Sequence, residues 1–432
     1  MTESAKALVR TIGRWSLAAL MVNTMIGGSI FGLPSLIAAR LGRLSPAAYL
    51  IAFAGIAVIA ACLAEVASRF QETGGPYLYA REAFGRFVAI QIGWLTWLSR
   101  ISAASAVANL FVTYLGEFSP TVGRPVARAM VLVILIALLA TVNYRGVSGG
   151  NRLSNFFTIS KLAVLAFFVV AGFAALTLHP TIRITPAAVQ TTAAGWFETI
   201  ILLVYAYGGF EAALVVSGEA RDPRKDAPAA LLYAIVITTM LYIAVQYLVI
   251  HTLANPGATN KPVVDSARQF LGPTGVLIVA AGTLVSAYGY LSANMLHTPR
   301  ITFAMGERGD FPAFFSAIHP SFRTPYLSIV AFTLPLIVFS IGGDFRWNAT
   351  LSAVSRLFIY GSVVAALPVL RRKHPVTSGF RLPYGGLFAA LGLLFTGVLV
   401  TRMHLAEFIV ISITFALALL NWLWTRNRAV IS

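Results

Sequence analysis

Apolar stretches of roughly 20 residues, the helix length that crosses a hydrocarbon core of about 30 Å, follow one another along almost the whole chain. The polar connections between them and both chain ends are too short for a soluble domain. We therefore expect one all-α integral membrane domain of residues 15–424, between ends at 1–14 and 425–432. The pattern predicts twelve spans, near residues 15–38, 45–68, 87–118, 126–143, 154–178, 195–218, 229–253, 273–303, 326–342, 348–370, 384–402 and 405–424.

Two of these spans are interrupted at their centres by paired glycines. Gly27 and Gly28 lie in MVNTMIGGSIFGLP of the first span, and Gly208 and Gly209 lie in LLVYAYGGFEAALVVSGE of the sixth. Non-helical backbone at membrane depth is tolerated only where it is buried in protein or lines a cavity. A break frees amide groups at one half-helix end and carbonyls at the other, which suits a small zwitterion. The two breaks predict two structural repeats that meet at one midplane site, as in a secondary transporter.

Composition and charge agree with a membrane protein. The chain is 58% hydrophobic and 11% charged, with a mean hydropathy of +0.80. A net charge of +17 could indicate nucleic acid, but lysine and arginine gather at the span ends. With the N-terminus in the cytoplasm, 20 of them fall inside and 9 outside. The positive-inside rule therefore predicts cytoplasmic termini in the inner membrane and no nucleic-acid partner.

The sequence lacks the signatures of an enzyme or a cofactor site. It has no Walker motif, zinc signature or GxSxG, and its histidines lack metal-ligand spacing. Cys62 is the only cysteine, which excludes an intramolecular disulfide. The N-terminus is basic and then apolar but has no small-residue cleavage site, so we expect it to be retained. We expect no cofactor, no metal and no enzymatic activity. A channel would need a water-lined span or a carbonyl filter, and neither is evident.

Four segments of the chain, MIGGSIFGLP, GGPYLYAREAFG, YAYGGFEAALVVSGEARDPRKDAP and RITFAMGERGDFPAFFSAIHP, together resemble the amino acid–polyamine–organocation superfamily of transporters. They occur in the family's order and at its spacing. The resemblance implies a leucine-transporter-like fold with inverted repeats of five spans each, near 15–178 and 195–370, followed by two helices at 384–424. It also implies amino acids or related amines as substrates.

The same resemblance assigns the first break to the substrate carboxylate, which backbone amides would bind. The commoner family pattern has glycine at the position of Ser29. An alternative is that the glycines only allow close helix packing. The residues concerned are Ile26, Gly27, Gly28, Ser29 and Ile30.

In the sixth span the resemblance assigns carbonyl groups to the substrate ammonium, from Tyr205, Ala206, Tyr207 and Gly208. Phe210 would gate or wall the pocket, although the two tyrosines could equally be ordinary packing. Glu211 begins the second half-helix. It could bind a cationic group, relay a proton or cap the half-helix, and we favour the cap.

Lys161, in NFFTISKLAVL, lies deep in the fifth span. Sodium-independent members of the family place a lysine at this position, which a sodium ion fills in sodium-coupled relatives. The ammonium would hold the first and eighth spans together, with Ser286 as its neighbour from the eighth. Because burial disfavours the charged amine, its protonation could become coupled to transport. The alternative is a side chain that snorkels to the surface.

Arg100 and Arg356 also lie within spans. We expect both to face the protein interior and to pair with Glu211 or Glu198. The alternative is that Arg100 reads an anionic group on the substrate.

Together these features predict a secondary active transporter that moves neutral amino acids by alternating access, independent of sodium and coupled to protons. An amino acid exchanger or a carrier of polyamines or cationic amino acids remains an alternative. The expected partners are the substrate, protons and the lipid bilayer, without a partner subunit. Three inside connections carry turn residues, at 73–85, 218–230 and 305–325. We expect a short amphipathic surface helix in 305–325, and the alternative is that all three are plain solvated connectors.

Overall fold

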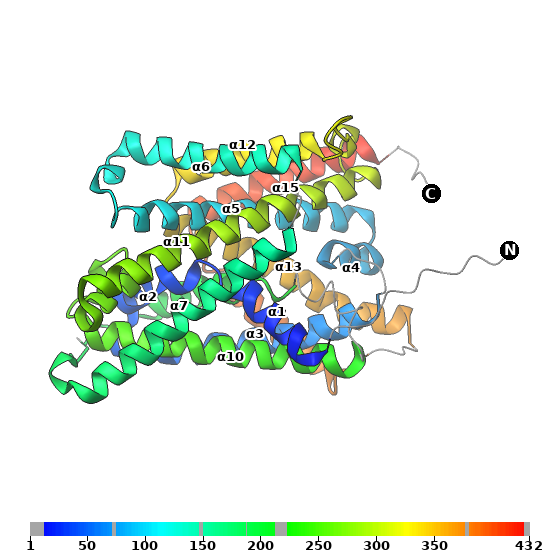
Figure 1. Ribbon diagram of the computed structural model, residues 1–432. Coiled ribbons are helices and arrows are strands. Elements are labelled where there is room, and N and C mark those ends of the chain that lie inside the picture. The colour runs from blue at the N-terminus through cyan, green and yellow to red at the C-terminus, as the bar shows by residue number, and fades with distance from the viewer. Residues whose placement is uncertain are drawn as a thin grey trace.

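The computed structural model describes residues 13–70, 75–146, 150–186, 188–211, 223–375 and 380–426, without the side chains of 150–155 and 223–224. These residues form helices joined by short connections, with no strand in the described ranges, which confirms the all-α prediction. The helices lie side by side in a bundle (Figure 1). They are α1 (Arg14–Met25), α2 (Ser29–Leu41), α3 (Ser45–Ser68), α4 (Gly75–Phe84), α5 (Arg86–Leu115), α6 (Pro125–Arg145), α7 (Gly150–Leu178), α8 (Ala193–Tyr207), α10 (Pro223–Thr252), α11 (Pro262–Glu307), α12 (Tyr326–Gly342), α13 (Phe345–Lys373), α14 (Gly385–Val400) and α15 (Leu405–Thr425).

The described part contains eight segments that are long and apolar enough to cross a membrane, together with the shorter apolar helices α8, α12 and α14. Each predicted span overlaps a helix or, for the first, the pair α1 and α2; the sixth span is described only as far as residue 211. The protein is therefore a multi-pass membrane protein, while twelve crossings stays a prediction. Helix α11 bends at Gly272, whose φ of 61° is not helical, so a separate helical segment from Pro262 precedes the predicted eighth span.

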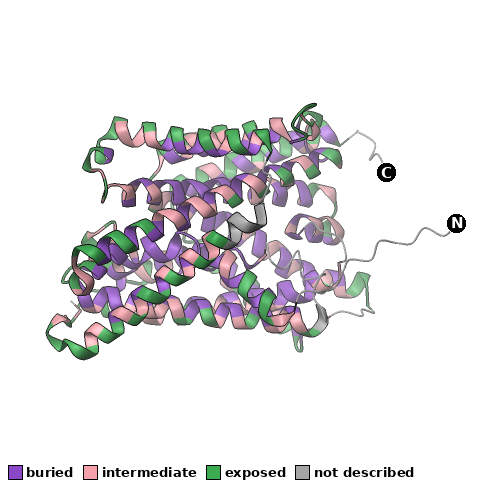
Figure 2. Cartoon of the chain, in the orientation of Figure 1, coloured by how far each residue is buried: buried purple, intermediate pink, exposed green. Residues whose placement is uncertain are grey.

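The centre of the bundle is formed by α5 and α13. In the most apolar stretch of each helix, 78% and 67% of the residues are buried. In the corresponding stretches of α6 and α7 only 22% of the residues are buried. The exposed residues of these two helices lie on the outside of the bundle in Figure 2. Exposed apolar side chains on an outer helix are expected where the surrounding solvent is lipid.

Helix packing follows a paired pattern. Helix α5 contacts α13 extensively, and α7 contacts α11; α1 contacts α10, and α3 contacts α8. If the first five spans are equivalent to the next five, the α5–α13 contact corresponds to the α7–α11 contact. The α1–α10 contact then corresponds to the α3–α8 contact. Two inverted repeats would produce this pattern, and the repeat boundaries remain a prediction.

Ion pairs join connections that were predicted to lie on the same side of the membrane. On the predicted inner side, Glu65 contacts Arg69 and Arg371 at 2.6 and 2.5 Å. Buried Asp310 contacts Arg81 and Arg86 at 3.2 and 2.6 Å. Each cluster links helices that are far apart in sequence.

A third contact of Asp310 comes from Tyr77 on α4, whose hydroxyl donates to the carboxylate. Burial and this hydrogen bond raise the pKa of Tyr77 to about 12. On the predicted outer side, Glu117 contacts Lys261 and Arg268.

Two expectations for the inner connections were wrong. Residues 75–84 form helix α4, with Tyr77 and Tyr79 buried, rather than a solvated loop. Residues 305–325 contain a 3₁₀ turn at Ala313–Ser316 instead of an amphipathic surface helix. The reason is that Phe311 and Phe315 are buried against the bundle, so burial of aromatic rings overrides the helical pattern. The inner connection after the sixth span lies partly in residues 212–222, outside the described ranges.

Candidate functional site

The first span is interrupted between α1 and α2. Helix α1 ends at Met25, and the Ile26 and Gly27 amides donate to the carbonyls of Val22 and Met25, both at 2.9 Å. These two amides are therefore already bonded. Helix α2 begins at Ser29, so the N–H groups that its first turn leaves open are the ones suited to a carboxylate. Gly28, Ser29 and Ile30 lie at this start of α2, and the assignment of their amides to a substrate carboxylate stays a prediction.

The sixth span is interrupted directly beside it. Helix α8 ends at Tyr207, and the chain turns at Gly208 and Gly209, which has a φ of 121°. A Cβ on Gly209 would overlap the Thr24 carbonyl at the end of α1, and one on Gly208 would overlap the Arg356 guanidinium. Gly209 therefore requires glycine, both for its close approach to backbone atoms and for its backbone angle, whereas the neighbour of Gly208 is the end of a side chain. The two breaks thus pack against each other.

Tyr242 of α10 joins the two breaks. Its hydroxyl lies 3.1 Å from the Met25 carbonyl, 2.9 Å from the Ala206 carbonyl and 3.1 Å from the Ser29 hydroxyl. A phenol has one proton to donate, so it serves one carbonyl at a time while Ser29 can donate to it. The carbonyls at both helix ends therefore share one buried hydroxyl.

Lys161 of α7 holds the end of α1. Its ammonium donates to the Asn23 and Ile26 carbonyls at 2.8 and 2.6 Å, and the residue is 8% exposed. It therefore does not snorkel to the surface. The carbonyls it satisfies are those that a half-helix end offers to a monovalent cation.

The predicted link from Lys161 to the eighth span is not formed. The Ser286 hydroxyl on α11 is buried and has no hydrogen-bond partner in the described part of the chain. The reason is that the Lys161 ammonium points at the two carbonyls of α1. Lys161 therefore connects α7 to α1, and Ser286 is not its partner here.

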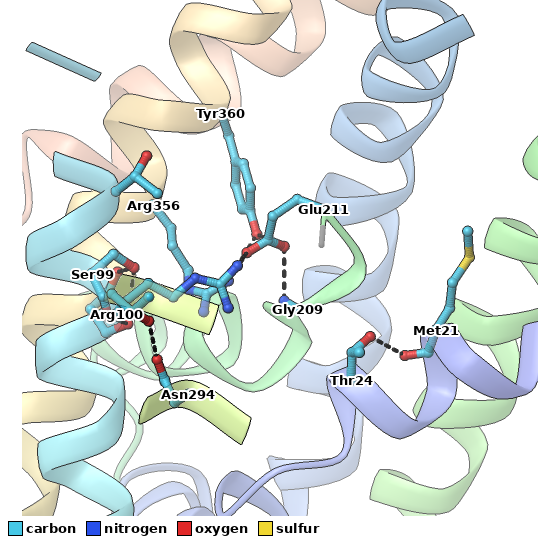
Figure 3. A network of polar contacts seen from close by, with 12 residues as sticks. Met21, Thr24, Ser99, Arg100, Gly209, Glu211, Asn294, Arg356 and Tyr360 are labelled. Carbon is cyan, nitrogen blue, oxygen red and sulfur yellow. Dashed lines mark hydrogen bonds and ion pairs between the residues drawn. The ribbon is translucent and has the colours of Figure 1, made fainter. Parts of the chain in front are cut away.

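Glu211 lies at the centre of a buried charge cluster (Figure 3). Its carboxylate accepts the Gly209 amide at 2.8 Å, the Arg356 guanidinium at 2.5 Å and the Tyr360 hydroxyl at 3.1 Å. Arg100 of α5 lies 3.7 Å away. Both arginines thus pair with Glu211, one of the two glutamates that were expected as partners, and the amide contact is that of a cap. Glu198 is not their partner.

Comparison with known proteins identifies the family of this membrane protein. The amino acid permease family model matches residues 12–423. The chain belongs to the amino acid permease family. It is accordingly a transporter and not an enzyme.

Several proteins of Bacillus subtilis (strain 168) are similar to this permease over most of both chains. A methylthioribose transporter is 27% identical over 88% of this chain and 86% of its own. A serine/threonine exchanger is 28% identical over 83% and 82%. A branched-chain amino acid permease is 25% identical over 93% and 90%.

The aromatic residues of the permease's sixth span are buried and well packed. The Tyr207 hydroxyl contacts the Tyr49 carbonyl at 3.2 Å and the Thr239 hydroxyl at 2.8 Å, between α3 and α10. Phe210 stacks on the Tyr360 ring at 5.5 Å. Tyr205 packs edge-on against a phenylalanine of α13. The Tyr207 side chain is therefore packed between helices, as the alternative interpretation expected. The role of Phe210 in walling the pocket stays a prediction.

The carbonyls predicted to receive an ammonium are partly occupied in this structure. The Tyr205 carbonyl accepts the Gly208 amide at 3.2 Å, and the Ala206 carbonyl accepts the Tyr242 hydroxyl. An ammonium at the Ala206 carbonyl would share this oxygen with the Tyr242 hydroxyl, because a carbonyl oxygen can accept two hydrogen bonds. The continuation of the sixth span, residues 212–218, lies outside the described ranges.

Sequence reasoning missed Tyr242, because one tyrosine in a long apolar helix carries no distinctive signal. It also missed Tyr360, which lies four residues after Arg356 and hence on the same face of α13. That spacing beside a buried arginine was the only available clue.

Proposed function

We propose that this permease carries neutral amino acids across the cytoplasmic membrane, without sodium and coupled to protons. The observation that carries the proposal is the pair of hydrogen bonds from the Lys161 ammonium to the Asn23 and Ile26 carbonyls. A sodium ion would need such oxygens as ligands, and the lysine already occupies them. A lysine amine can also take up and release a proton, which a fixed charge such as arginine cannot.

The charge cluster beside the breaks supports neutral substrates. The Glu211 carboxylate is already bound by Arg356 and approached by Arg100. It therefore offers little to a second ammonium group, and the surplus positive charge would repel one. These contacts argue against polyamines and cationic amino acids as substrates.

Transport into proteoliposomes tests this proposal. The experiment measures sodium-free uptake of a panel of labelled amino acids, with and without an inward proton gradient. We expect accumulation of neutral amino acids that needs the gradient and falls at least tenfold in Lys161→Ala. Exposed Lys225 on α10 provides the matched control, and Lys225→Ala should keep wild-type uptake.

Other outcomes of the same measurement contradict parts of the proposal. Uptake that ignores the gradient but requires amino acid preloaded inside would make the permease an exchanger, as the similarity to a serine/threonine exchanger also allows. Uptake stimulated by sodium would contradict sodium independence. A partner subunit is not part of the proposal.

A further inference from the structure

A cavity of about 360 Å³ lies at the predicted outer end of the bundle. Its walls come from the end of α2, the beginning of α8, the beginning of α13, and the turn and first residues between α14 and α15. Its volume falls in the range of roughly 300–1,000 Å³ that small-molecule sites occupy. The cavity is separate from the two helix breaks.

One carboxylate in this cavity is fully paired. Glu198 contacts Arg40 at 2.8 Å, Arg346 at 3.0 Å and His404 at 3.6 Å. Two of the arginines that line the cavity are therefore paired with Glu198, and the Glu198 carboxylate is already bound by positive charge.

The Asp344 carboxylate, also in the lining, caps α13 by accepting the Trp347 amide at 2.8 Å, whereas the third carboxylate, that of Glu407, is not paired. Glu407 lines the cavity and is 3% exposed, and its Oε2 is buried with no hydrogen-bond partner in the described part of the chain. Burial of a carboxylate without a hydrogen-bond donor or a counter-charge is unfavourable. The Glu407 carboxylate therefore lacks a hydrogen-bond donor, and a positively charged ammonium group would be the strongest one.

A cation in the same cavity also lacks a carboxylate. Arg402 is exposed, and its guanidinium lies 4.6 Å from the centre of the Phe197 ring, a cation–π contact. No ion pair or side-chain hydrogen bond joins Arg402 to another described residue. Ile201, Leu202 and Trp347 add apolar surface to the same cavity.

We propose that this cavity is a peripheral binding site for an amino acid in its zwitterionic form. The ammonium pairs with Glu407, the carboxylate pairs with Arg402, and the side chain lies against Ile201, Leu202 and Trp347. The identity of the ligand rests on the proposed function, whereas the charge pattern does not. Both charged groups come from the α14–α15 region, which gives the two helices after the predicted repeats a role in binding.

Equilibrium dialysis of the full-length permease in lipid nanodiscs tests the site, with tritiated L-leucine as the probe in sodium-free buffer. We expect two leucines per wild-type chain and one per chain in Glu407→Gln and in Arg402→Gln. Gly27→Val, which fills the central break, should also retain one. Glu307→Gln makes the same change at an exposed glutamate of α11 and should keep two.

The remaining site in Gly27→Val reports the ligand chemistry. Leucine should bind it at least tenfold more tightly than 3-methylbutylamine, which lacks the carboxylate, or 4-methylpentanoate, which lacks the ammonium. Equal binding of the amine alone would overturn the zwitterion assignment.

The outcomes separate this site from the proposed function. If Glu407→Gln binds as many leucines as the wild type, or if the wild type binds none, the outer site does not exist. If no amino acid is taken up but one bound leucine is lost in Glu407→Gln and Arg402→Gln, the outer site stands without the transport proposal. All variants must elute as monodisperse proteins.

Discussion

Arg356 lies on α13 with its side chain 4% exposed and its guanidinium against the Glu211 carboxylate. Arg346 lies on the same helix and also contacts a glutamate, at 3.0 Å, but its side chain is 49% exposed. Breaking a buried ion pair by removing one partner costs about 3–5 kcal/mol, whereas an exposed pair contributes about 0–1 kcal/mol. Arg356→Gln should therefore lower the thermal unfolding midpoint strongly.

Arg346→Gln is the matched control for that prediction, and thermal unfolding in detergent measures both variants. We expect its midpoint to stay close to that of the wild type. Equal losses in the two variants would mean that burial does not set the contribution of the Glu211 cluster.

Tyr242 contributes one hydroxyl to the carbonyls of two helix ends. In Tyr242→Phe those buried carbonyls lose their donor, at a cost of about 1–3 kcal/mol, and the two breaks lose a shared contact. We expect uptake to fall at least tenfold. Tyr233→Phe on the same helix is the control, because Tyr233 stacks on Trp15 at 5.1 Å through its ring. Normal uptake by Tyr242→Phe would show that the bridge is not needed.

At the scale of helices, the close approach of the turn after α8 to the end of α1 depends on Gly209. Its φ of 121° disfavours any side chain, and a Cβ there would overlap the Thr24 carbonyl. Gly209→Ala should separate the two breaks and abolish uptake. Gly397 on α14 has open space around its Cβ position and an ordinary φ, so Gly397→Ala should retain uptake. A transport-competent Gly209→Ala would argue against a site built by the two breaks.

The connection after α5 is tied to the beginning of α11 through Glu117, which accepts hydrogen bonds from Lys261 and Arg268. Burial alone would raise the pKa of the Glu117 carboxyl, but the two cations hold it below its ordinary value of 4.5. A carboxyl with a lower pKa in the folded state stabilises that state above the unfolded pKa, and the stabilisation is lost as the pH falls through the folded pKa.

Acidification below pH 4.5 should therefore lower the thermal midpoint of the wild type more than that of Glu117→Gln. Unfolding scans from neutral pH into the acid range measure this, with Glu307→Gln as the control. Parallel curves for wild type and Glu117→Gln would contradict the electrostatic tie.

The helix breaks could be predicted from sequence because a glycine pair at the centre of an apolar span interrupts a helix that lipid would otherwise keep continuous. Lys161 could be placed on the interior because its depth in the span excludes solvent. The side-chain partners could not be predicted. Whether Lys161 bonds to Ser286 or only to α1, and whether Tyr207 faces the site or α3, depends on helix rotation of a few tens of degrees. A pattern of apolar residues does not determine such rotations when a helix is buried all round.

At the scale of the whole molecule, the charged clusters separate by side. Glu65 and Asp310 gather arginines from connections predicted to be inside, and Glu117 and Glu198 gather cations from connections predicted to be outside. No ion pair between described residues joins the two sets of connections. Since the inner set also carries more lysine and arginine, the positive-inside rule assigns it to the cytoplasm.

Cysteine accessibility tests that orientation. Cys62 is the only cysteine and is buried, so a Cys62→Ala background leaves no reactive thiol. Gln190 lies in an exposed outer connection and Ser321 in an exposed inner one. In intact cells a membrane-impermeant maleimide should label Gln190→Cys and leave Ser321→Cys unlabelled until the cells are lysed. Labelling of Ser321→Cys alone in intact cells would mean that the permease has the opposite orientation in the membrane. The cavity that contains Glu407 and Arg402 would then open to the cytoplasm.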